Sequence, residues 1–291
     1  MTMSYAMRTY QPTECFICKG RNCRIVFSYD HPDQYEKTVG IDEERYIRKW
    51  VQCKHCGLYY SIYSRDAAVL DSIYTSYRSE DVPWRKESPQ ETFNKVINLP
   101  PEKSETAFRV SWIKNHLQRM WEDKLFRRGD SLRLLDIGGG TGIFAYAFQD
   151  EMWKSYVIDP SADASFFKDK LGIPLIKDYY RPGTFGHPFD LISLVYLLEH
   201  VRNPDTLLKS IQGDLGRSSL VYIEVPDALC FKFKPAEDDI FNSCHLWMFN
   251  PTTLSTLLDS CGFEILALDR VKTARGHFAL MVLAGKKMTA W

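Results

Sequence analysis

The segment LLDIGGGTGIFAYAF, residues 134–148, constrains the fold of this chain more than any other, because glycine fills four of the five positions from 138 to 142. Glycine loses more backbone entropy on folding than any other residue, so such a cluster needs a physical reason. The apolar run 132–137 predicts a buried strand, and residues 142–150 predict a helix. In a parallel α/β sheet, such a loop lets the backbone approach a ligand and turns helix N–H groups toward it. We therefore predict a loop that wraps a nucleotide-like cofactor, with a purely structural tight turn as the alternative.

Strand-like and helix-like segments alternate from residue 105 onward. The strands are expected within residues 132–137, 154–159, 174–178, 189–201, 218–226, 263–272 and 277–287. The helices are expected within residues 104–126, 142–150, 160–172, 203–215 and 250–262, with Pro160 and Ser161 suited to a helix start. This alternation predicts an α/β fold with a doubly wound parallel sheet. The last two strands have no helix between them, which predicts an antiparallel strand at the edge.

The acidic residue before the glycine loop bears on the identity of the cofactor. The loop fits the loose dinucleotide pattern G-x-G-x-x-G/A. However, Asp136 ends the preceding strand and precedes Gly138, Gly140 and Gly142, and a carboxylate there would repel a nearby pyrophosphate. The same carboxylate would attract the ammonium group of an amino-acid moiety. S-adenosylmethionine carries such a group and NAD does not, so the former is favoured.

Two further carboxylates are placed to bind the nucleoside. Asp159 ends the second strand, where a carboxylate can accept hydrogen bonds from both ribose hydroxyls; a helix cap is the alternative. Asp178 follows the third strand and is placed to accept the adenine amino group, with a solvated loop acid as the alternative. A ribose-binding acid occurs with either type of cofactor, so Asp159 indicates a nucleoside without naming it.

Five segments in order resemble the successive motifs of class I S-adenosylmethionine-dependent methyltransferases. They are LLDIGGGTG, VIDPS, FDLISLVYLLEHVRNPDTLL, LVYIEVPD and HLWMFNPTTLSTLLDSCGFEI, and the resemblance covers residues 105–285. It implies a Rossmann-like seven-stranded sheet of order 3-2-1-4-5-7-6 with strand 7 antiparallel. It also implies that Asp136 and the glycine loop hold the methionine end of the cofactor, Asp159 the ribose and Asp178 the adenine.

Two C-x-x-C pairs mark the N-terminal region. Cys15 and Cys18 form the first pair, and Cys53 and Cys56 form the second, with 34 residues between the two pairs. Two such pairs supply the four thiolates of a tetrahedral structural Zn²⁺ site. Chance cysteines, an iron–sulfur cluster or a redox pair are the alternatives. If the four cysteines bind zinc, Cys15→Ser is expected to destabilise residues 1–80 and to leave the methyltransferase fold largely intact.

A four-cysteine ribbon fused to this methyltransferase pattern resembles a narrower group. These are bacterial zinc-ribbon methyltransferases of nucleotide-sugar and surface-polysaccharide pathways, including deoxysugar C-methyltransferases. The C-methyltransferases of this group carry a further C-terminal domain, whereas this sequence stops at Trp291. That difference argues against carbon methylation and leaves oxygen and nitrogen acceptors open. The resemblance implies a sugar or nucleotide-sugar as the small-molecule substrate.

Transfer from a sulfonium mainly requires alignment of the two reactants, and a hydroxyl acceptor also gains from a general base. Glu199 and His200 follow the fourth strand, beside the expected position of the methyl group, and His200 is the candidate base with Glu199 orienting it or the substrate. Loop scaffolding is the alternative role. His245 follows the fifth strand and is a second candidate, against helix capping or packing with Trp247. Arg109 could meet a substrate phosphate, although a solvated helix face is the plainer interpretation.

Charge and hydropathy exclude several classes of function. Lysine and arginine number 37, as do aspartate and glutamate, and the isoelectric point is near 7, which argues against a nucleic-acid partner. No run approaches 18 apolar residues, and the N-terminus lacks the pattern of a signal peptide, so membrane insertion is not expected and a cytoplasmic location is. The rivals are an RNA methyltransferase that reads RNA through its ribbon, and a non-catalytic cofactor-binding module.

Composition divides the chain into three parts. Residues 1–80 are expected to form the zinc ribbon, 81–104 a polar linker or lid, and 105–291 the S-adenosylmethionine-binding domain. The sequence does not indicate an oligomeric state.

Overall fold

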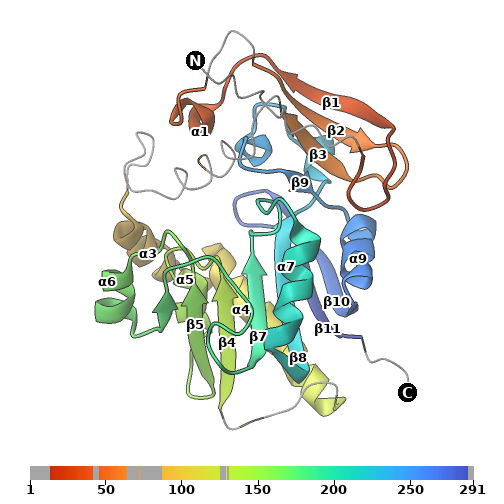
Figure 1. Ribbon diagram of the computed structural model, residues 1–291. Coiled ribbons are helices and arrows are strands. Elements are labelled where there is room, and N and C mark those ends of the chain that lie inside the picture. The colour runs from red at the N-terminus through yellow and green to blue at the C-terminus, as the bar shows by residue number, and fades with distance from the viewer. Residues whose placement is uncertain are drawn as a thin grey trace, which may run out of the picture.

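The computed structural model describes residues 14–41, 46–63, 72, 87–124, 129 and 131–287. It contains a seven-stranded sheet and a smaller four-stranded sheet (Figure 1). The remaining parts of the expected ribbon and linker lie outside the described residues. No helix among the described segments is long and apolar enough to cross a membrane.

The large sheet has the order β10-β11-β8-β7-β4-β5-β6. Its strands are β4 (Leu132–Ile137), β5 (Trp153–Ile158), β6 (Leu175–Ile176), β7 (Phe189–Val195), β8 (Leu215–Pro226), β10 (Phe263–Lys272) and β11 (Phe278–Lys286). Strands β4 to β8 pair in parallel, and β11 is antiparallel to both of its neighbours, β8 and β10. When the seven strands of this sheet are numbered 1 to 7 in chain order, their order in the sheet is 3-2-1-4-5-7-6. The predicted fold is therefore confirmed.

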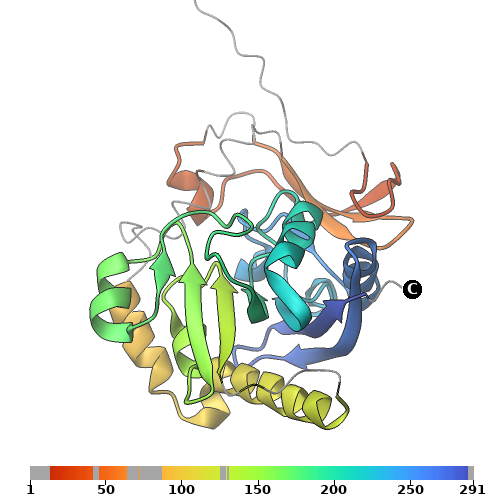
Figure 2. The same ribbon diagram turned by 60° about the horizontal axis from the view of Figure 1, so that its bottom comes forward.

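Helices cover both faces of the large sheet because its strands are apolar on both sides. One face packs against α4 (Glu105–Glu122) and α5 (Ile143–Phe148); Leu134 points to this side. The opposite face packs against α7 (Pro204–Ile211) and α9 (Pro251–Ser260); Leu135 points there. Figure 2 shows α4 lying along the face opposite α7.

Short elements complete this part of the chain. They are α3 (Pro89–Ile97), η1 (Pro101–Lys103), α6 (Ala164–Phe166), the π-turn η2 (Phe167–Leu171), η3 (Gln212–Asp214), α8 (Cys230–Phe233) and η4 (Asp239–Phe241). Helix α3 lies in the segment expected to be a linker or lid, and its Phe93 is buried beside Ala145 and Phe166. This part of the segment therefore packs on the large-sheet domain.

The expected start of the helix after β5 is wrong. The helix begins after Asp163, whose carboxylate accepts hydrogen bonds from the backbone of Ser165 and Phe166. Ser161 cannot cap it, because its backbone N–H and hydroxyl both donate to Asp159 at 2.8 Å. Asp159 thus draws residues 160–161 into a turn at the strand end.

The small sheet joins distant parts of the chain. Its order is β1-β2-β3-β9, with β1 (Cys23–Tyr29), β2 (Arg48–Cys53), β3 (Tyr59–Tyr63) and β9 (Trp247–Met248), and α1 (Gln34–Lys37) lies between β1 and β2. The two residues of β9 pair with Tyr59 and Tyr60, although they come from the part of the chain that forms the large sheet. The small sheet lies over the edge at which the parallel strands end (Figure 1).

Candidate active site

Side chains of the protein itself pack closely against the glycine loop. A Cβ atom on Gly139 would lie 2.7 Å from Oδ2 of Asp136, and one on Gly142 would lie 2.7 Å from the ring of Phe167. Gly142 also has a φ of 77°, a left-handed conformation that favours glycine. Part of the reason for the cluster is therefore internal packing, which the sequence did not reveal.

Both carboxylates expected near the loop accept hydrogen bonds within the protein, and Asp159 bonds to the loop itself. Asp136 is buried and accepts a hydrogen bond from the hydroxyl of Ser193 at 2.7 Å. Asp159 is also buried, and its Oδ2 accepts the backbone N–H of Gly140 at 2.9 Å. Asp159 therefore links the ends of β4 and β5 directly.

A cavity of about 480 Å³ opens at the carboxyl ends of the parallel strands. This is the place and the size expected for a ligand site in such a sheet. Gly138, Asp178 and His200 line the cavity, so residues predicted for the cofactor and for the acceptor face one space. Its other walls come from residues 179–182, from α7 and from residues 243–246. Asp136, Gly140, Gly142, Asp159, Glu199 and His245 do not line it.

Glu199, His200 and His245 converge although 45 residues separate the first two from the third. The rings of His200 and His245 have centroids 4.8 Å apart, and Nε2 of His200 lies 3.8 Å from a carboxylate oxygen of Glu199. Glu199 is fully buried, and the side chain of His200 is 7% exposed. Burial lowers the pKa of His245, which keeps its ring neutral near pH 7.

Backbone hydrogen bonds fasten the loop after β7 to the segment before β9. The carbonyl of Glu199 accepts from the backbone N–H of Leu246 at 2.7 Å, and the indole of Trp247 donates to the carbonyl of Val201 at 2.8 Å. Nδ1 of His200 lies 2.9 Å from the carbonyl oxygen of Cys244. The two histidines are thus held at one junction between the loop after β7 and the segment before β9.

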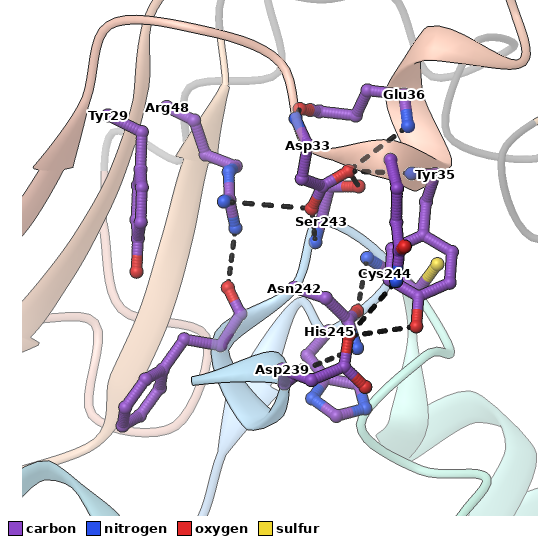
Figure 3. A network of polar contacts seen from close by, with 12 residues as sticks. Tyr29, Asp33, Tyr35, Glu36, Arg48, Asp239, Asn242, Ser243, Cys244 and His245 are labelled. Carbon is purple, nitrogen blue, oxygen red and sulfur yellow. Dashed lines mark hydrogen bonds and ion pairs between the residues drawn. The ribbon is translucent and has the colours of Figure 1, made fainter. Parts of the chain in front are cut away.

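The N-terminal part of the chain anchors this junction from the other side (Figure 3). Asp33 accepts the backbone N–H of Ser243 at 2.6 Å and its hydroxyl at 2.8 Å, and Arg48 donates to the carbonyl of Phe241 at 2.5 Å. The hydroxyl of Tyr63 donates to the carbonyl of Ser243 at 2.6 Å. Sequence analysis missed this network, because its partners are about 200 residues apart and follow no local motif.

The four predicted zinc ligands form one cluster. Cys15 Sγ lies 3.5 Å from Cys56 Sγ, and Cys18 Sγ lies 3.5 Å from Cys53 Sγ. All four sulfur atoms lie within 4.8 Å of one another, and no disulfide joins the described cysteines. In a tetrahedral site with Zn–S bonds of about 2.3 Å, sulfur atoms are about 3.8 Å apart. The donor set and its spacing therefore fit a Zn²⁺ ion.

Arg109 differs from the expectation of a solvated helix face. It is buried, and its guanidinium pairs with both carboxylate oxygens of Glu224 on β8. Glu224 also accepts the hydroxyl of Tyr222 at 2.5 Å. The pair fixes α4 against the large sheet instead of facing a substrate phosphate.

Arg109→Met should lower the free energy of unfolding by about 3–5 kcal/mol, because it leaves the carboxylate of Glu224 buried without its countercharge. Urea denaturation measures this. The matched control is Arg275→Met, which breaks the more exposed pair with Glu105 and should cost about 0–1 kcal/mol. Equal effects of the two substitutions would contradict the structural role given to Arg109.

The sheet order, the glycine loop and the cavity at the strand ends together define a class I S-adenosylmethionine-dependent methyltransferase. Within that class, the chain belongs to the methyltransferase domain family, whose sequence profile matches residues 109–268. A comparison with curated protein sequences finds no significant match.

The fold is similar to that of a solved methyltransferase, and a second solved structure gives a weaker match. The 1,6-didemethyltoxoflavin-N1-methyltransferase of Burkholderia thailandensis, determined with 1,6-didemethyltoxoflavin and S-adenosylhomocysteine, is 15% identical, with a TM-score of 0.53 over 79% of this chain and 96% of that chain. An S-adenosylmethionine-dependent methyltransferase of Clostridium acetobutylicum is 12% identical, with a TM-score of 0.47 over 68% and 98% of the two chains.

Proposed function

We propose that the protein transfers the methyl group of S-adenosylmethionine to a hydroxyl of a small molecule, most simply a sugar or nucleotide-sugar. The single observation that carries this proposal is the shared cavity, which Gly138, Asp178 and His200 all line. Its volume of about 480 Å³ suits small molecules. The equal numbers of acidic and basic residues give no support to a nucleic-acid substrate.

The lining of the cavity supports a phosphorylated sugar in particular. Arg181 and Arg202 contribute cationic side chains, and Tyr179 contributes an aromatic ring 57% exposed. Guanidinium groups match phosphate oxygens, and aromatic faces pack against bases and sugar rings. A nucleotide-sugar would use both kinds of contact.

Each candidate residue is assigned a role from its position in the fold. Bound S-adenosylmethionine supplies a methyl group already activated by a sulfonium. Asp136 and the glycine loop are proposed to bind its amino-acid end, Asp159 its ribose and Asp178 its adenine. His200, held through Nδ1, is proposed to activate the acceptor hydroxyl. It can do so by accepting the proton on Nε2 or by holding an ion that lowers the pKa of the hydroxyl.

The four cysteines are proposed to bind a structural Zn²⁺. Four thiolates leave no open coordination position for a substrate. The ion would close the two turns at Cys15–Cys18 and Cys53–Cys56, and the second turn leads directly into β3. Zinc would thereby stabilise the small sheet that anchors residues 241–245.

Calorimetry and labelled methyl transfer test the proposal together. We expect the protein to bind S-adenosylmethionine and to move its labelled methyl group onto a nucleotide-sugar or a free sugar from a panel of acceptors. Labelling of tRNA or ribosomal RNA alone would replace the proposed substrate class with the RNA alternative. Absence of cofactor binding by the folded protein would reject the proposal altogether.

Asp159→Ala should weaken S-adenosylmethionine binding tenfold or more, because charge-assisted hydrogen bonds to the ribose, each worth about 1.5–3 kcal/mol, are lost. The loss of its bond to Gly140 should loosen the loop as well. Asp163→Ala is the control, since Asp163 caps the next helix by similar backbone hydrogen bonds. Unchanged affinity in a folded Asp159→Ala protein would refute the assignment.

A further inference from the structure

The junction between the loop after β7 and the segment before β9 gathers a second set of groups that can ligate a metal. One ligand atom from each of Glu199, His200 and His245 lies within 4.8 Å of the other two. This set shares no residue with the four-cysteine cluster, and it offers nitrogen and oxygen instead of sulfur. Two imidazoles and one carboxylate are a common set for divalent transition metals that keep open positions.

Both histidines are held in the orientation that metal-binding imidazoles usually have. Nδ1 of His200 lies 2.9 Å from the carbonyl oxygen of Cys244, and Nδ1 of His245 lies 2.8 Å from that of Ile240. A carbonyl only accepts, so each neutral ring carries its proton on Nδ1 and its lone pair on Nε2. Hydrogen bonds from the second ring nitrogen to carbonyls are the usual support of a metal-binding histidine.

The spacing is close to that of a loaded site. Metal–ligand bonds of about 2.1 Å at tetrahedral or octahedral angles place neighbouring ligand atoms about 3.0–3.5 Å apart. The 3.8 Å between Nε2 of His200 and Oε1 of Glu199 exceeds this by less than an ångström, and all three ligand atoms lie within 4.8 Å of one another. Because His200 also lines the cavity, an ion at this position would border the space proposed for the acceptor.

We propose that Glu199, His200 and His245 bind a divalent transition-metal ion, of which Mn²⁺, Fe²⁺ and Co²⁺ are the representative cases, and that the acceptor hydroxyl coordinates this ion. The inference rests on the proposed function for its substrate but not for its ligands. A set of two imidazoles and one carboxylate suits transition metals such as Fe²⁺, whereas Mg²⁺ and Ca²⁺ prefer ligand sets made of oxygen. The anchoring of residues 241–245 by Asp33, Arg48 and Tyr63 would keep the third ligand in register with the first two.

The ion would change how the hydroxyl is activated. Coordination lowers the pKa of the hydroxyl, so its proton leaves to water in the cavity. The oxygen then forms the new O–CH₃ bond, while the methyl–sulfur bond breaks and its electron pair stays on sulfur. His200 acts as a ligand in this scheme and not as the proton acceptor.

Titration with Mn²⁺ tests the site without any acceptor. The full chain is first loaded with one equivalent of Zn²⁺ for the cysteines and then titrated with Mn²⁺, while paramagnetic resonance measures the free ion. We expect one Mn²⁺ per wild-type chain, with at least tenfold weaker binding by Glu199→Gln and His245→Ala. The control is His116→Ala on α4, whose Nδ1 also lies near a carbonyl, that of Trp112, and which should bind Mn²⁺ normally. Equal Mn²⁺ binding by wild type and the two site variants would overturn the inference.

Two further measurements separate the possible failures. Thermal unfolding of Glu199→Gln, which preserves the shape of the side chain, shows that a loss of Mn²⁺ is not a loss of fold. S-adenosylmethionine affinity, measured with and without Mn²⁺, tests the proposed function independently. Cofactor binding without any site-specific Mn²⁺ binding would reject the ion site and leave the methyltransferase proposal standing. Site-specific Mn²⁺ binding without cofactor binding would support the ion site and reject the methyltransferase proposal.

Discussion

His200→Ala should reduce the rate of methyl transfer by about 10²–10⁴-fold and leave S-adenosylmethionine affinity unchanged. The side chain borders the cavity that Gly138 and Asp178 also line, and the bond to the carbonyl of Cys244 fixes its ring. Removing the ring takes away the group that activates the hydroxyl, whether the ring accepts the proton or holds an ion. Single-turnover rates with an acceptor found in the panel, together with calorimetry of the cofactor, measure both quantities.

The control for this prediction is again His116→Ala, because His116 is outside the residues that line the cavity. It should transfer methyl groups at the wild-type rate. If His200→Ala also turned over normally, alignment of the reactants alone would suffice, and a more nucleophilic acceptor such as an amine would replace the hydroxyl. Reduced cofactor affinity would instead place His200 in the cofactor site.

Cys15→Ser should remove zinc and destabilise more than the N-terminal residues. Structural zinc contributes about 10–16 kcal/mol to the folding of small zinc domains, so loss of one ligand should open the ribbon. Strand β3 pairs with β9, and Tyr63, Trp247 and Phe249 belong to one apolar core. We therefore expect faster amide exchange over residues 46–63 and also over 241–249, with methyl transfer reduced in parallel. These contacts extend the expected effect of Cys15→Ser from residues 1–80 to residues 241–249.

Cys23→Ser provides the comparison, because Cys23 lies at the start of β1 outside the four-cysteine cluster. It should keep zinc, as measured by elemental analysis, and normal exchange in both segments. Cofactor affinity should survive in Cys15→Ser, since Asp159 and the glycine loop are held by contacts within the large sheet. Unchanged exchange at 241–249 in zinc-free protein would show that the two regions are energetically independent.

The large sheet could be predicted because each of its strands carries its own signal. The apolar run 132–137, for example, ends where β4 ends. Strand β9 could not be predicted, because two residues show no periodicity and their pairing depends on a strand nearly 190 positions earlier. The predicted start of the helix after β5 was wrong for a local reason. Ser161 donates its hydrogen bonds to Asp159 and therefore does not cap the helix.

The site could be predicted in outline only. Strand ends that share one edge bring Asp136, Asp159 and His200 to the same region by topology alone. Topology does not reveal which side chains face the cavity, and Asp159 turns out to hold Gly140. It also does not show that carbonyls of the loop before β9 orient the two histidines. Those contacts depend on non-local packing, as does the burial of Arg109 against Glu224.

The contacts of β3 with residues 243–248 also determine when the small sheet can be completed during synthesis of the chain. Tyr63 and Ser243, bonded at this junction, are 180 residues apart. At a synthesis rate of about 5–20 residues per second, Tyr63 emerges roughly 9–36 s before Ser243. Through that interval the outer edge of β3 presents backbone groups that can template another chain. The yield of folded protein should therefore depend on how long the edge of β3 stays unpaired during translation, and not only on the stability of the folded protein.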